Sequence, residues 1–393
     1  RFYPEAEVTA HMIGFTNLDD QGKEGLELAL NEQLAGEAGV KRVVKDLKGH
    51  RVQDVALIKA AHPGKDVTLS FDTRVQYAAY RELARGVAEH NATAGVLVSL
   101  DVNTGEVLAM ANLPSYNPNN RKQLTVDALR NRAVTDQFEP GSTLKPFTVA
   151  AALESGKFNV HSHFNTSPGT YKVLNKLIRD HENYGVIDMP TLLTKSSNVA
   201  SAQIAMALPR DTLPLLHRRL GFGHRTGSGF PGESAGSMQP SNRWNPVEIA
   251  TMSYGYGVTV TALQLAQAYA VIASGGIQRP ISFTKVTGPV PGKRILDEKI
   301  ARAIIPMMET VVTQEGTALR AAVPGYRIAG KTGTAHKAQG GGYASDAYMS
   351  LFVGMAPASA PRVVTAIIID NPRQGGYYGG LAAAPVFSRM MSD

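Results

Sequence analysis

The sequence has no cysteine, and no apolar run in it approaches the ~18 residues that a membrane-spanning helix needs. Without cysteine, disulfides, thiolate zinc sites and a cysteine nucleophile are excluded. Blocks of five or more lysines or arginines are also absent, so the net charge of +7 does not indicate a nucleic-acid-binding tail. Because the first residue is Arg1 and not methionine, we expect a processed or trimmed chain, and any signal or anchor would lie upstream of Arg1.

The composition is that of a globular protein, with 43% hydrophobic and 19% charged residues. At 393 residues we expect two or more domains, at least one of them large. Residues 1–65 are mixed and rich in loop-forming glycine, and the turn-forming run His62-Pro63-Gly64-Lys65 is a candidate domain boundary. Neither internal repeats nor low-complexity tracts occur.

Strand-like segments lie on both sides of a helical middle region. Two early strands and three late strands flank it, which favours one five-stranded antiparallel sheet assembled from both chain ends over repeating βαβ units. We therefore predict an α+β fold with a helical lobe beside the sheet. The expected strands are 67–71, 95–100, 106–111, 281–286, 327–335, 350–355 and 363–369, and the expected helices are 25–34, 76–90, 148–153, 192–207 and 261–273.

Three short motifs that carry acyl-transfer chemistry occur in order along the chain. Residues 142–145 (STLK) have the pattern S-x-x-K, residues 196–198 (SSN) the pattern S-x-N, and residues 331–334 (KTGT) the pattern K-T-G-T. The first two are weak alone, because S-x-x-K recurs at 282–285 and S-x-N recurs at 115–117. The K-T-G pattern occurs once, so the specificity lies in the combination.

The local context separates the two S-x-x-K motifs. Ser142 opens an alanine-rich helical stretch, where residues i and i+3 share a face, so that Lys145 can reach Ser142. A helix N-terminus also offers free N–H groups and a positive dipole to a developing oxyanion. Ser282 instead lies in the strand-like segment 281–286, where its side chain and that of Lys285 should point to opposite faces. We therefore predict that Ser142 is the nucleophile.

The third motif supplies what a lysine base requires. A lysine accepts a proton only when its amine is neutral, which burial or a neighbouring cation brings about. Lys331 is predicted to be that cation, on a strand edge facing the start of the Ser142 helix. Gly333 is expected to remove a side chain where the substrate backbone must approach. Thr332 and Thr334 flank it on one face and offer hydroxyls to a carboxylate.

Other motifs point elsewhere, and their contexts exclude them. Residues 325–332 match the phosphate-binding pattern G-x4-G-K-[ST], but that loop must open a helix, and glycines follow it here. The ~60 residues that remain are also too few for a parallel sheet with crossovers. Residues 227–232 match G-x-G-x-x-G without a preceding strand. His161 and His163 have no third ligand cluster, so we predict no metal and no cofactor.

With the three motifs in order, the chain resembles the class B penicillin-binding proteins along nearly its whole length. Two further segments, 10–15 (AHMIGF) and 377–380 (YYGG), are most similar to the division-specific (septal) branch of Gram-negative bacteria. The resemblance implies a penicillin-binding transpeptidase fold over 67–393, on a trimmed N-terminal pedestal over 1–66. It is carried mainly by residues 1–4 (RFYP), 138–146 (FEPGSTLKP), 195–198 (KSSN), 254–257 (YGYG) and 331–335 (KTGTA).

The resemblance also implies a mechanism. Ser142 would attack the D-Ala-D-Ala carbonyl of a peptidoglycan stem peptide, with Lys145 as general base, and an amine of a neighbouring stem would resolve the acyl-enzyme into a cross-link. Ser196 and Asn198 would relay protons and orient the peptide amide. The backbone N–H groups of Ser142 and Thr334 would form the oxyanion hole. Lys331, Thr332 and Thr334 would hold the substrate carboxylate, and β-lactams would acylate Ser142 and stay bound.

By the same resemblance, further residues are expected at the substrate cleft. His336 departs from relatives that carry arginine there, which puts carboxylate contacts at this position in doubt, although a histidine is partly charged near neutral pH. Without the family, each tyrosine would be assigned to the core. The expected cleft residues are Glu139, Tyr256, His336, Tyr348, Tyr377 and Tyr378.

The implied location is the periplasm, with a single N-terminal inner-membrane anchor outside this sequence. Implied partners are peptidoglycan stem peptides, β-lactams, a membrane glycosyltransferase and other division proteins, and no nucleic acid. The alternatives are an elongation-type transpeptidase, a D,D-carboxypeptidase, a serine β-lactamase and a non-catalytic β-lactam sensor or scaffold. A β-lactamase or carboxypeptidase needs efficient water activation, and we find no clear glutamate-centred motif for it.

Overall fold

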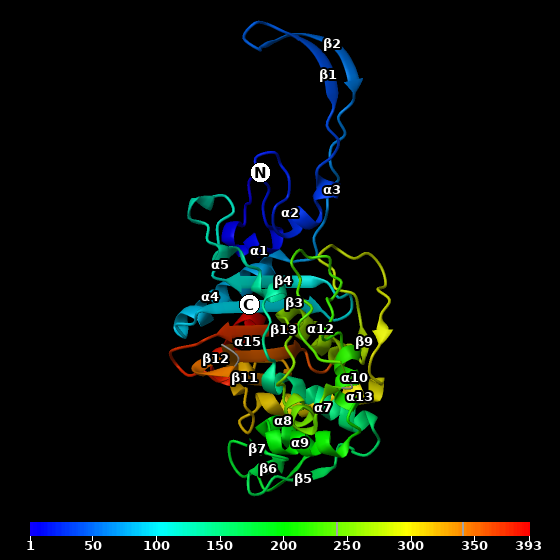
Figure 1. Ribbon diagram of the computed structural model, residues 1–393, viewed down its shortest axis with the longest axis vertical. Coiled ribbons are helices and arrows are strands. Elements are labelled where there is room, and N and C mark those ends of the chain that lie inside the picture. The colour runs from blue at the N-terminus through cyan, green and yellow to red at the C-terminus, as the bar shows by residue number, and fades with distance from the viewer. Residues whose placement is uncertain (241–242, 340–341) are drawn as a thin grey trace.

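A computed structural model describes residues 1–240, 243–339 and 342–393. The molecule is elongated, with a thin hairpin at one end, a sheet in the middle and a helical lobe at the other end (Figure 1). The hairpin pairs β1 (Val40–Lys45) with β2 (Arg51–Lys59), and every residue in it except Val43 is exposed. Among the described residues, no helix is both long and apolar enough to cross a bilayer.

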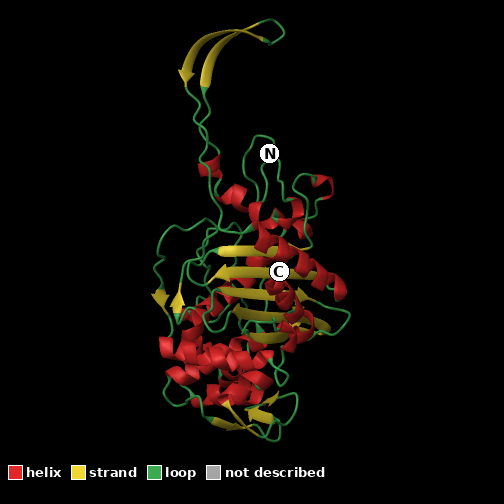
Figure 2. Cartoon of the chain, turned by 180° about the vertical axis from the view of Figure 1, so that it is seen from behind, coloured by secondary structure: helices red, strands yellow, loops and turns green. Residues whose placement is uncertain are grey.

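The central sheet is five-stranded and antiparallel, as the sequence predicts. From one edge to the other, its strands lie in the order β11-β12-β13-β3-β4. Its strands come from the chain segments before and after the helical lobe, and they lie one beside another across the middle of the molecule (Figure 2). Edge strand β11 carries the K-T-G-T motif toward that lobe. The strands are β3 (Ala94–Asp101), β4 (Val107–Leu113), β11 (Ala329–Gln339), β12 (Gly342–Ala356) and β13 (Val363–Asp370).

Helices cover both faces of this sheet. Six consecutive residues of β13 are buried, and because strand side chains alternate between faces, neither face is open to water there. Helices α4 (Thr73–Glu89) and α15 (Ala384–Ser392) pack on each other and on one face, where Phe387 meets Phe352 edge-on. Helix α12 (Ala262–Ala273) packs on β13 and β3 and is buried over nearly its whole length, which makes it the central helix of the core.

One predicted helix is wrong in a way that matters for the site. The segment 192–207 is not continuous but divides into α8 (Met189–Lys195) and α9 (Asn198–Ala207). Ser196 lies between them in the left-handed conformation, with φ +60°, and Ser197 caps α9 by accepting a hydrogen bond from the N–H of Ala200. The apolar periodicity continues through the break, so it conceals the turn.

Four other predicted segments need correction. Segments 67–71 and 281–286 are not strands and contribute only isolated bridges, Leu69 to Thr284 and Ser282 to Glu106. The predicted helix 25–34 forms two short helices, α2 (Gly25–Ala29) and α3 (Asn31–Leu34). Predicted strand 327–335 begins later, at Ala329. The predicted division at residues 66 and 67 stays a prediction.

The remaining elements are mostly short and surround the sheet and the lobe. The helices are α1 (Ala10–Ile13), α5 (Val126–Leu129), α6 (Arg132–Thr135), α7 (Lys145–Glu154), α10 (Thr212–Arg219), α11 (Pro246–Met252), α13 (Glu298–Glu309) and α14 (Gly379–Ala382). The strands are β5 (His163–Asn165), β6 (Thr170–Val173), β7 (Lys176–Arg179), β8 (Val186–Asp188), β9 (Ile277–Gln278) and β10 (Lys293–Arg294). The 3-10 turns are η1 (Ala6–Val8), η2 (Arg121–Gln123), η3 (Gly141–Leu144), η5 (Thr310–Val312) and η6 (Leu319–Ala321).

Candidate active site

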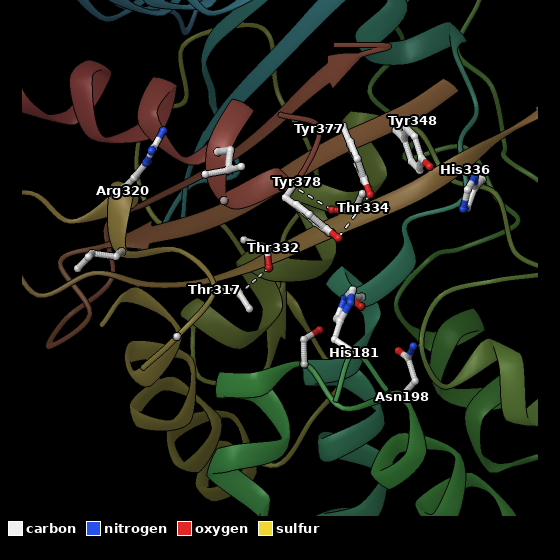
Figure 3. A pocket seen from close by; sticks show the side chains of 18 of the residues that line it. His181, Asn198, Thr317, Arg320, Thr332, Thr334, His336, Tyr348, Tyr377 and Tyr378 are labelled. Atoms are coloured by element: carbon white, nitrogen blue, oxygen red, sulfur yellow. Dashed lines mark hydrogen bonds between the residues drawn. The ribbon is translucent and has the colours of Figure 1, made fainter. Parts of the chain in front are cut away.

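The three motifs meet at one cleft of about 720 Å³ between the sheet edge and the helical lobe (Figure 3). Ser142 lies on η3, which leads directly into α7. Ser196 and Asn198 lie at the junction of α8 and α9, and Lys331 lies on β11. The predicted residues that line the cleft are Ser142, Ser196, Asn198, Tyr256, Thr332, Gly333, Thr334, His336, Tyr348, Tyr377 and Tyr378.

Lys145 connects the first two motifs. Its side chain is fully buried, and its Nζ lies 2.9 Å from the Oγ of Ser142. The same Nζ donates to the Oγ of Ser196 at 3.0 Å, to the Oδ1 of Asn198 at 2.8 Å and to the main-chain oxygen of Ser196. The predicted pairing of Ser142 with Lys145 is thus present in the geometry.

Lys331 approaches Ser196 from the opposite side. Its Nζ lies 3.0 Å from the Oγ of Ser196 and also donates to the main-chain oxygen of Thr332 at 3.1 Å. Burial lowers the pKa of Lys331 to about 7. The pKa of Lys145 is lowered well below its ordinary value, first by burial and then by the charge of Lys331, while Asp180 opposes the shift. The hydroxyl of Ser196 therefore lies between two buried amines, those of Lys145 and Lys331.

The turn carrying Ser142 is held by main-chain contacts with Gly255. The N–H of Gly141 donates to the carbonyl oxygen of Gly255 at 3.0 Å, and Tyr269 donates its hydroxyl to the carbonyl of Thr143 at 2.6 Å. Gly255 has a φ of +93°, and a Cβ added there would lie 1.9 Å from the carbonyl oxygen of Gly141. Any larger residue must displace the turn that presents Ser142.

Replacing Gly255 by alanine is expected to lower the free energy of unfolding by about 3 kcal/mol, since positive φ strain is combined with a main-chain clash. Denaturant unfolding measures the effect. Gly229→Ala is the matched control, because Gly229 has a φ of +76° but open space around its Cβ position. That variant should lose only about 1 kcal/mol. Equal losses in the two variants would contradict the role given to the clash.

The structure gives Gly333 a different reason for being glycine than the sequence suggests. A Cβ there would lie 2.9 Å from the carbonyl oxygen of Pro140 and 2.9 Å from the Cγ2 of Thr143. Close packing of β11 on η3 therefore excludes a side chain, whether or not a substrate is present. The flanking hydroxyls are partly engaged: that of Thr332 lies 2.7 Å from the hydroxyl of Thr317, and Thr334 accepts from the N–H of Gly379 at 3.1 Å.

Four of the expected ring-bearing residues, Tyr378, Tyr377, Tyr348 and His336, form one row along the upper side of the cleft (Figure 3). The rings of Tyr348 and Tyr377 stack at 4.0 Å with 14° between their planes. Tyr378 lies 4.6 Å from Tyr377, and His336 lies 4.6 Å from Tyr348. A nitrogen of His336 is 3.1 Å from the carbonyl oxygen of Ala344. These rings form one wall of the cleft that Ser142 also lines.

Glu139 occupies a supporting position rather than a cleft-lining one. Its Oε1 accepts a hydrogen bond from the N–H of Gly257 at 2.8 Å, which ties the segment before Ser142 to the loop carrying Tyr256. It is not among the residues that line the cleft. Contact between Glu139 and a substrate stays a prediction.

Several cleft residues carry no motif and were missed by sequence reasoning. His181, after β7, faces the ring of Tyr378 at 5.9 Å, and Arg320 on η6 lines the opposite end. Asp180 accepts three hydrogen bonds at the S-x-N turn, from the hydroxyl of Ser197 and from the N–H groups of the two residues that follow it. No local pattern could have identified these residues, because only the fold brings His181 and Arg320 to the cleft and Asp180 to the S-x-N turn. Within the described residues, no group of three or more His, Asp or Glu could hold a metal ion.

Comparisons with known proteins agree with this geometry. The family model "Penicillin binding protein transpeptidase domain" matches residues 95–392, and the "Penicillin-binding Protein dimerisation domain" matches residues 1–69. The whole chain is 46% identical to the peptidoglycan D,D-transpeptidase FtsI of Escherichia coli K12, of which it spans 66%, slightly less than two thirds. It is 43% identical to the probable peptidoglycan D,D-transpeptidase PenA of Neisseria gonorrhoeae, of which it spans 67%.

A solved structure is similar as well. The transpeptidase domain of penicillin-binding protein 3 from Burkholderia pseudomallei has a TM-score of 0.77 and 39% identity, and the match covers 84% of this chain and 96% of that one. The family match includes the segments that carry all three motifs of the cleft. The chain belongs to the penicillin-binding protein transpeptidase family, with an N-terminal segment of the penicillin-binding protein dimerisation family.

Proposed function

We propose that the protein is a serine D,D-transpeptidase that cross-links peptidoglycan stem peptides. The observation that carries this proposal is the buried chain of contacts from Ser142 through Lys145 and Ser196 to Lys331. A serine hydroxyl is a weak nucleophile until a base takes its proton, and a desolvated lysine amine next to a second lysine is such a base. The relatives named as D,D-transpeptidases support the same activity.

In the acylation half-reaction, the Oγ of Ser142 attacks the carbonyl carbon of the penultimate D-Ala and its proton passes to Lys145. The negative charge that forms on the carbonyl oxygen is met by the backbone N–H groups of Ser142 and Thr334. The C–N bond then breaks, and a proton relayed through Ser196 reaches the leaving amine of the terminal D-Ala. An ester between Ser142 and the shortened stem remains.

In the second half-reaction, the amine of a neighbouring stem attacks this ester. Its proton returns by the same route, a new peptide bond forms, and the hydroxyl of Ser142 is restored. Lys331, in its charged form, attracts the terminal carboxylate of the donor stem toward Thr332 and Thr334. Asn198 orients the stem's amide, while Tyr256, His336, Tyr348, Tyr377 and Tyr378 border the bound peptide. A β-lactam ring mimics the donor and leaves a stable ester on Ser142.

We further propose a septal role in a Gram-negative cell, since the chain is similar over its full length to FtsI and PenA. The catalytic domain would face the periplasm, and a membrane anchor would lie in the part of such proteins that this chain does not span. A membrane glycosyltransferase and other division proteins are the proposed partners. The named relatives support each of these points.

Intact-protein mass spectrometry after mixing with benzylpenicillin tests the chemistry. We expect one adduct per chain that persists for hours, because a transpeptidase active site excludes efficient water attack. An adduct that disappears within seconds would identify a β-lactamase instead. No adduct on folded protein would overturn the acyl-transfer proposal.

A second assay separates transfer from hydrolysis. The probe is a thioester analogue of a D-Ala-D-Ala peptide, offered together with a D-amino acid as acceptor amine. Transfer to the amine supports a transpeptidase, whereas release of the free acid alone would indicate a carboxypeptidase. A penicillin adduct with neither product would indicate a sensor or scaffold, and would contradict the proposed function.

A further inference from the structure

The turn that carries Ser196 and Asn198 is fastened by a carboxylate from outside all three motifs. Asp180 follows directly after β7 (Lys176–Arg179) and is half-buried. Its Oδ2 accepts from the hydroxyl of Ser197 at 2.6 Å, and its Oδ1 accepts from the N–H groups of Asn198 at 2.6 Å and Val199 at 3.0 Å. One side chain thus satisfies three donors at the start of α9.

We propose that Asp180 is a positioning residue for the acylation reaction: it holds the Ser196–Asn198 turn against Lys145, and its negative charge acts on the ammonium group of Lys145. The inference rests on the proposed function, because it assumes that Lys145 accepts the proton of Ser142. It adds a residue that neither the sequence motifs nor the family matches assign.

The geometric half of the proposal follows from the orientation of Asn198. The Nδ2 of Asn198 donates to the carbonyl oxygen of Arg179 at 3.0 Å, which leaves its Oδ1 to accept from Lys145 at 2.8 Å. Because a carbonyl can only accept, this contact fixes which end of the amide faces the lysine. Asp180 therefore binds the backbone N–H of Asn198, and Arg179, the last residue of β7, binds its side chain.

A carboxylate at a helix N-terminus is also well placed energetically. Helix α9 is ten residues long, and its first two N–H groups are those that Asp180 binds. The free N–H groups and the helix dipole favour negative charge there, and charge-assisted hydrogen bonds are roughly twice as strong as neutral ones. An asparagine at position 180 would keep one acceptor and lose the charge.

The electrostatic half depends on which charges act on Lys145. Lys331 disfavours its protonated form and Asp180 favours it, while Ser142, Ser196 and Asn198 are neutral. Four charged groups on the elements packed around α7 are paired: Arg219 of α10 with Glu154, Lys195 of α8 with Glu315, Arg302 of α13 with Glu298, and Glu309 of α13 with Arg327. Arg218 of α10 donates to the carbonyl oxygen of Gln239, and Lys299 of α13 is exposed. His217 of α10 is buried, and burial lowers its pKa to about 4, which leaves it neutral above that pH.

The test is the pH profile of acylation by benzylpenicillin, measured for the wild type and Asp180→Asn. The rate rises with pH as Lys145 loses its proton. Removing the negative charge makes that proton easier to lose, so the acidic limb of Asp180→Asn should lie lower by about half a pH unit or more. A purely structural defect would lower the acylation rate at every pH without changing the pH at which the acidic limb rises.

Asp188→Asn is the matched control. Asp188 is also a helix-capping carboxylate, at the start of α8, where its Oδ1 accepts from the N–H of Thr191 at 2.9 Å. Asp188 is not among the charges that act on Lys145. The acidic limb of the pH profile of Asp188→Asn should therefore coincide with that of the wild type. An unmoved limb in Asp180→Asn, or equal shifts in both variants, would overturn the proposal. A wild type that is never acylated would instead refute the proposed function.

Asp180→Glu separates the two halves of the proposal and carries the test if Asp180→Asn does not fold. It keeps the charge, but its longer side chain places the carboxylate about one methylene farther from the backbone. We expect its acidic limb near that of the wild type and its plateau rate at least about tenfold lower, since positioning errors near 1 Å are costly. A wild-type rate in a folded Asp180→Glu protein would contradict the positioning role.

Discussion

Replacing Ser142 by alanine should abolish acylation by benzylpenicillin, with a fall in rate of at least about 10⁴-fold, because loss of a covalent nucleophile removes the reaction path itself. Ser196 remains in this variant, and its Oγ also lies 3.0 Å from the Nζ of Lys145. It should not substitute for Ser142, since it is bound by two amines and lies between helices. Ser142 instead lies where η3 leads into α7, beside β11.

The decoy motif supplies the control for this experiment. The Oγ of Ser282 donates to the carbonyl oxygen of Thr284 at 2.7 Å, and the Nζ of Lys285 pairs with Glu106 at 3.4 Å. The sequence prediction that this serine and lysine do not pair agrees with these contacts, although the segment is not a strand. Ser282→Ala should therefore be acylated at the wild-type rate. A penicillin adduct in Ser142→Ala that maps to Ser196 or Ser282 would refute the assignment of the nucleophile.

The sheet could be predicted from sequence because its strands carry the pattern themselves. The β-branched run at 363–369 and the hairpin around Asn103-Thr104-Gly105 specify strands locally, and all three late strands were found. Segments 67–71 and 281–286 have similar alternation but form only single bridges. Whether such a segment becomes a strand depends on its neighbours, which local alternation does not reveal.

The site could be predicted from sequence where the interacting residues are close together in the chain. It could not be predicted where only the fold brings them together. Ser142 and Lys145 are one helical turn apart in an alanine-rich stretch, so their spacing together with the predicted helix predicts their contact. The turn at Ser196–Asn198 is hydrogen-bonded to Asp180, 18 positions before Asn198, and local periodicity continues across the break between α8 and α9. The same limit explains why His181 and Arg320, on loops without a motif, were missed. Gly333 was identified, but its packing against Pro140 required the structure.

Replacing Lys145 by methionine should lower the acylation rate by about 10³-fold, the range expected for loss of a general base. Its Nζ lies 2.9 Å from the Oγ of Ser142, and burial and Lys331 lower its pKa so that a neutral amine is available. Lys145→Arg should be equally inactive although it keeps a cation, since a guanidinium stays protonated. Stopped-flow acylation by benzylpenicillin measures both variants, with Lys285→Met as a control of wild-type rate. Full activity in Lys145→Arg would contradict a base at this position.

The same substitution should change how stability depends on pH. Because the pKa of Lys145 is lowered in the folded protein, the unfolded chain binds more protons than the folded one as pH rises toward the ordinary pKa of 10.5, so the wild-type free energy of unfolding should increase over that range. Lys331, whose pKa is lowered to about 7, contributes in the same direction between 7 and 10.5. Lys145→Met removes one of these two contributions. Urea unfolding between pH 7 and 10 should therefore give a shallower rise for the variant, and identical slopes would show that Lys145 is not held neutral by the fold.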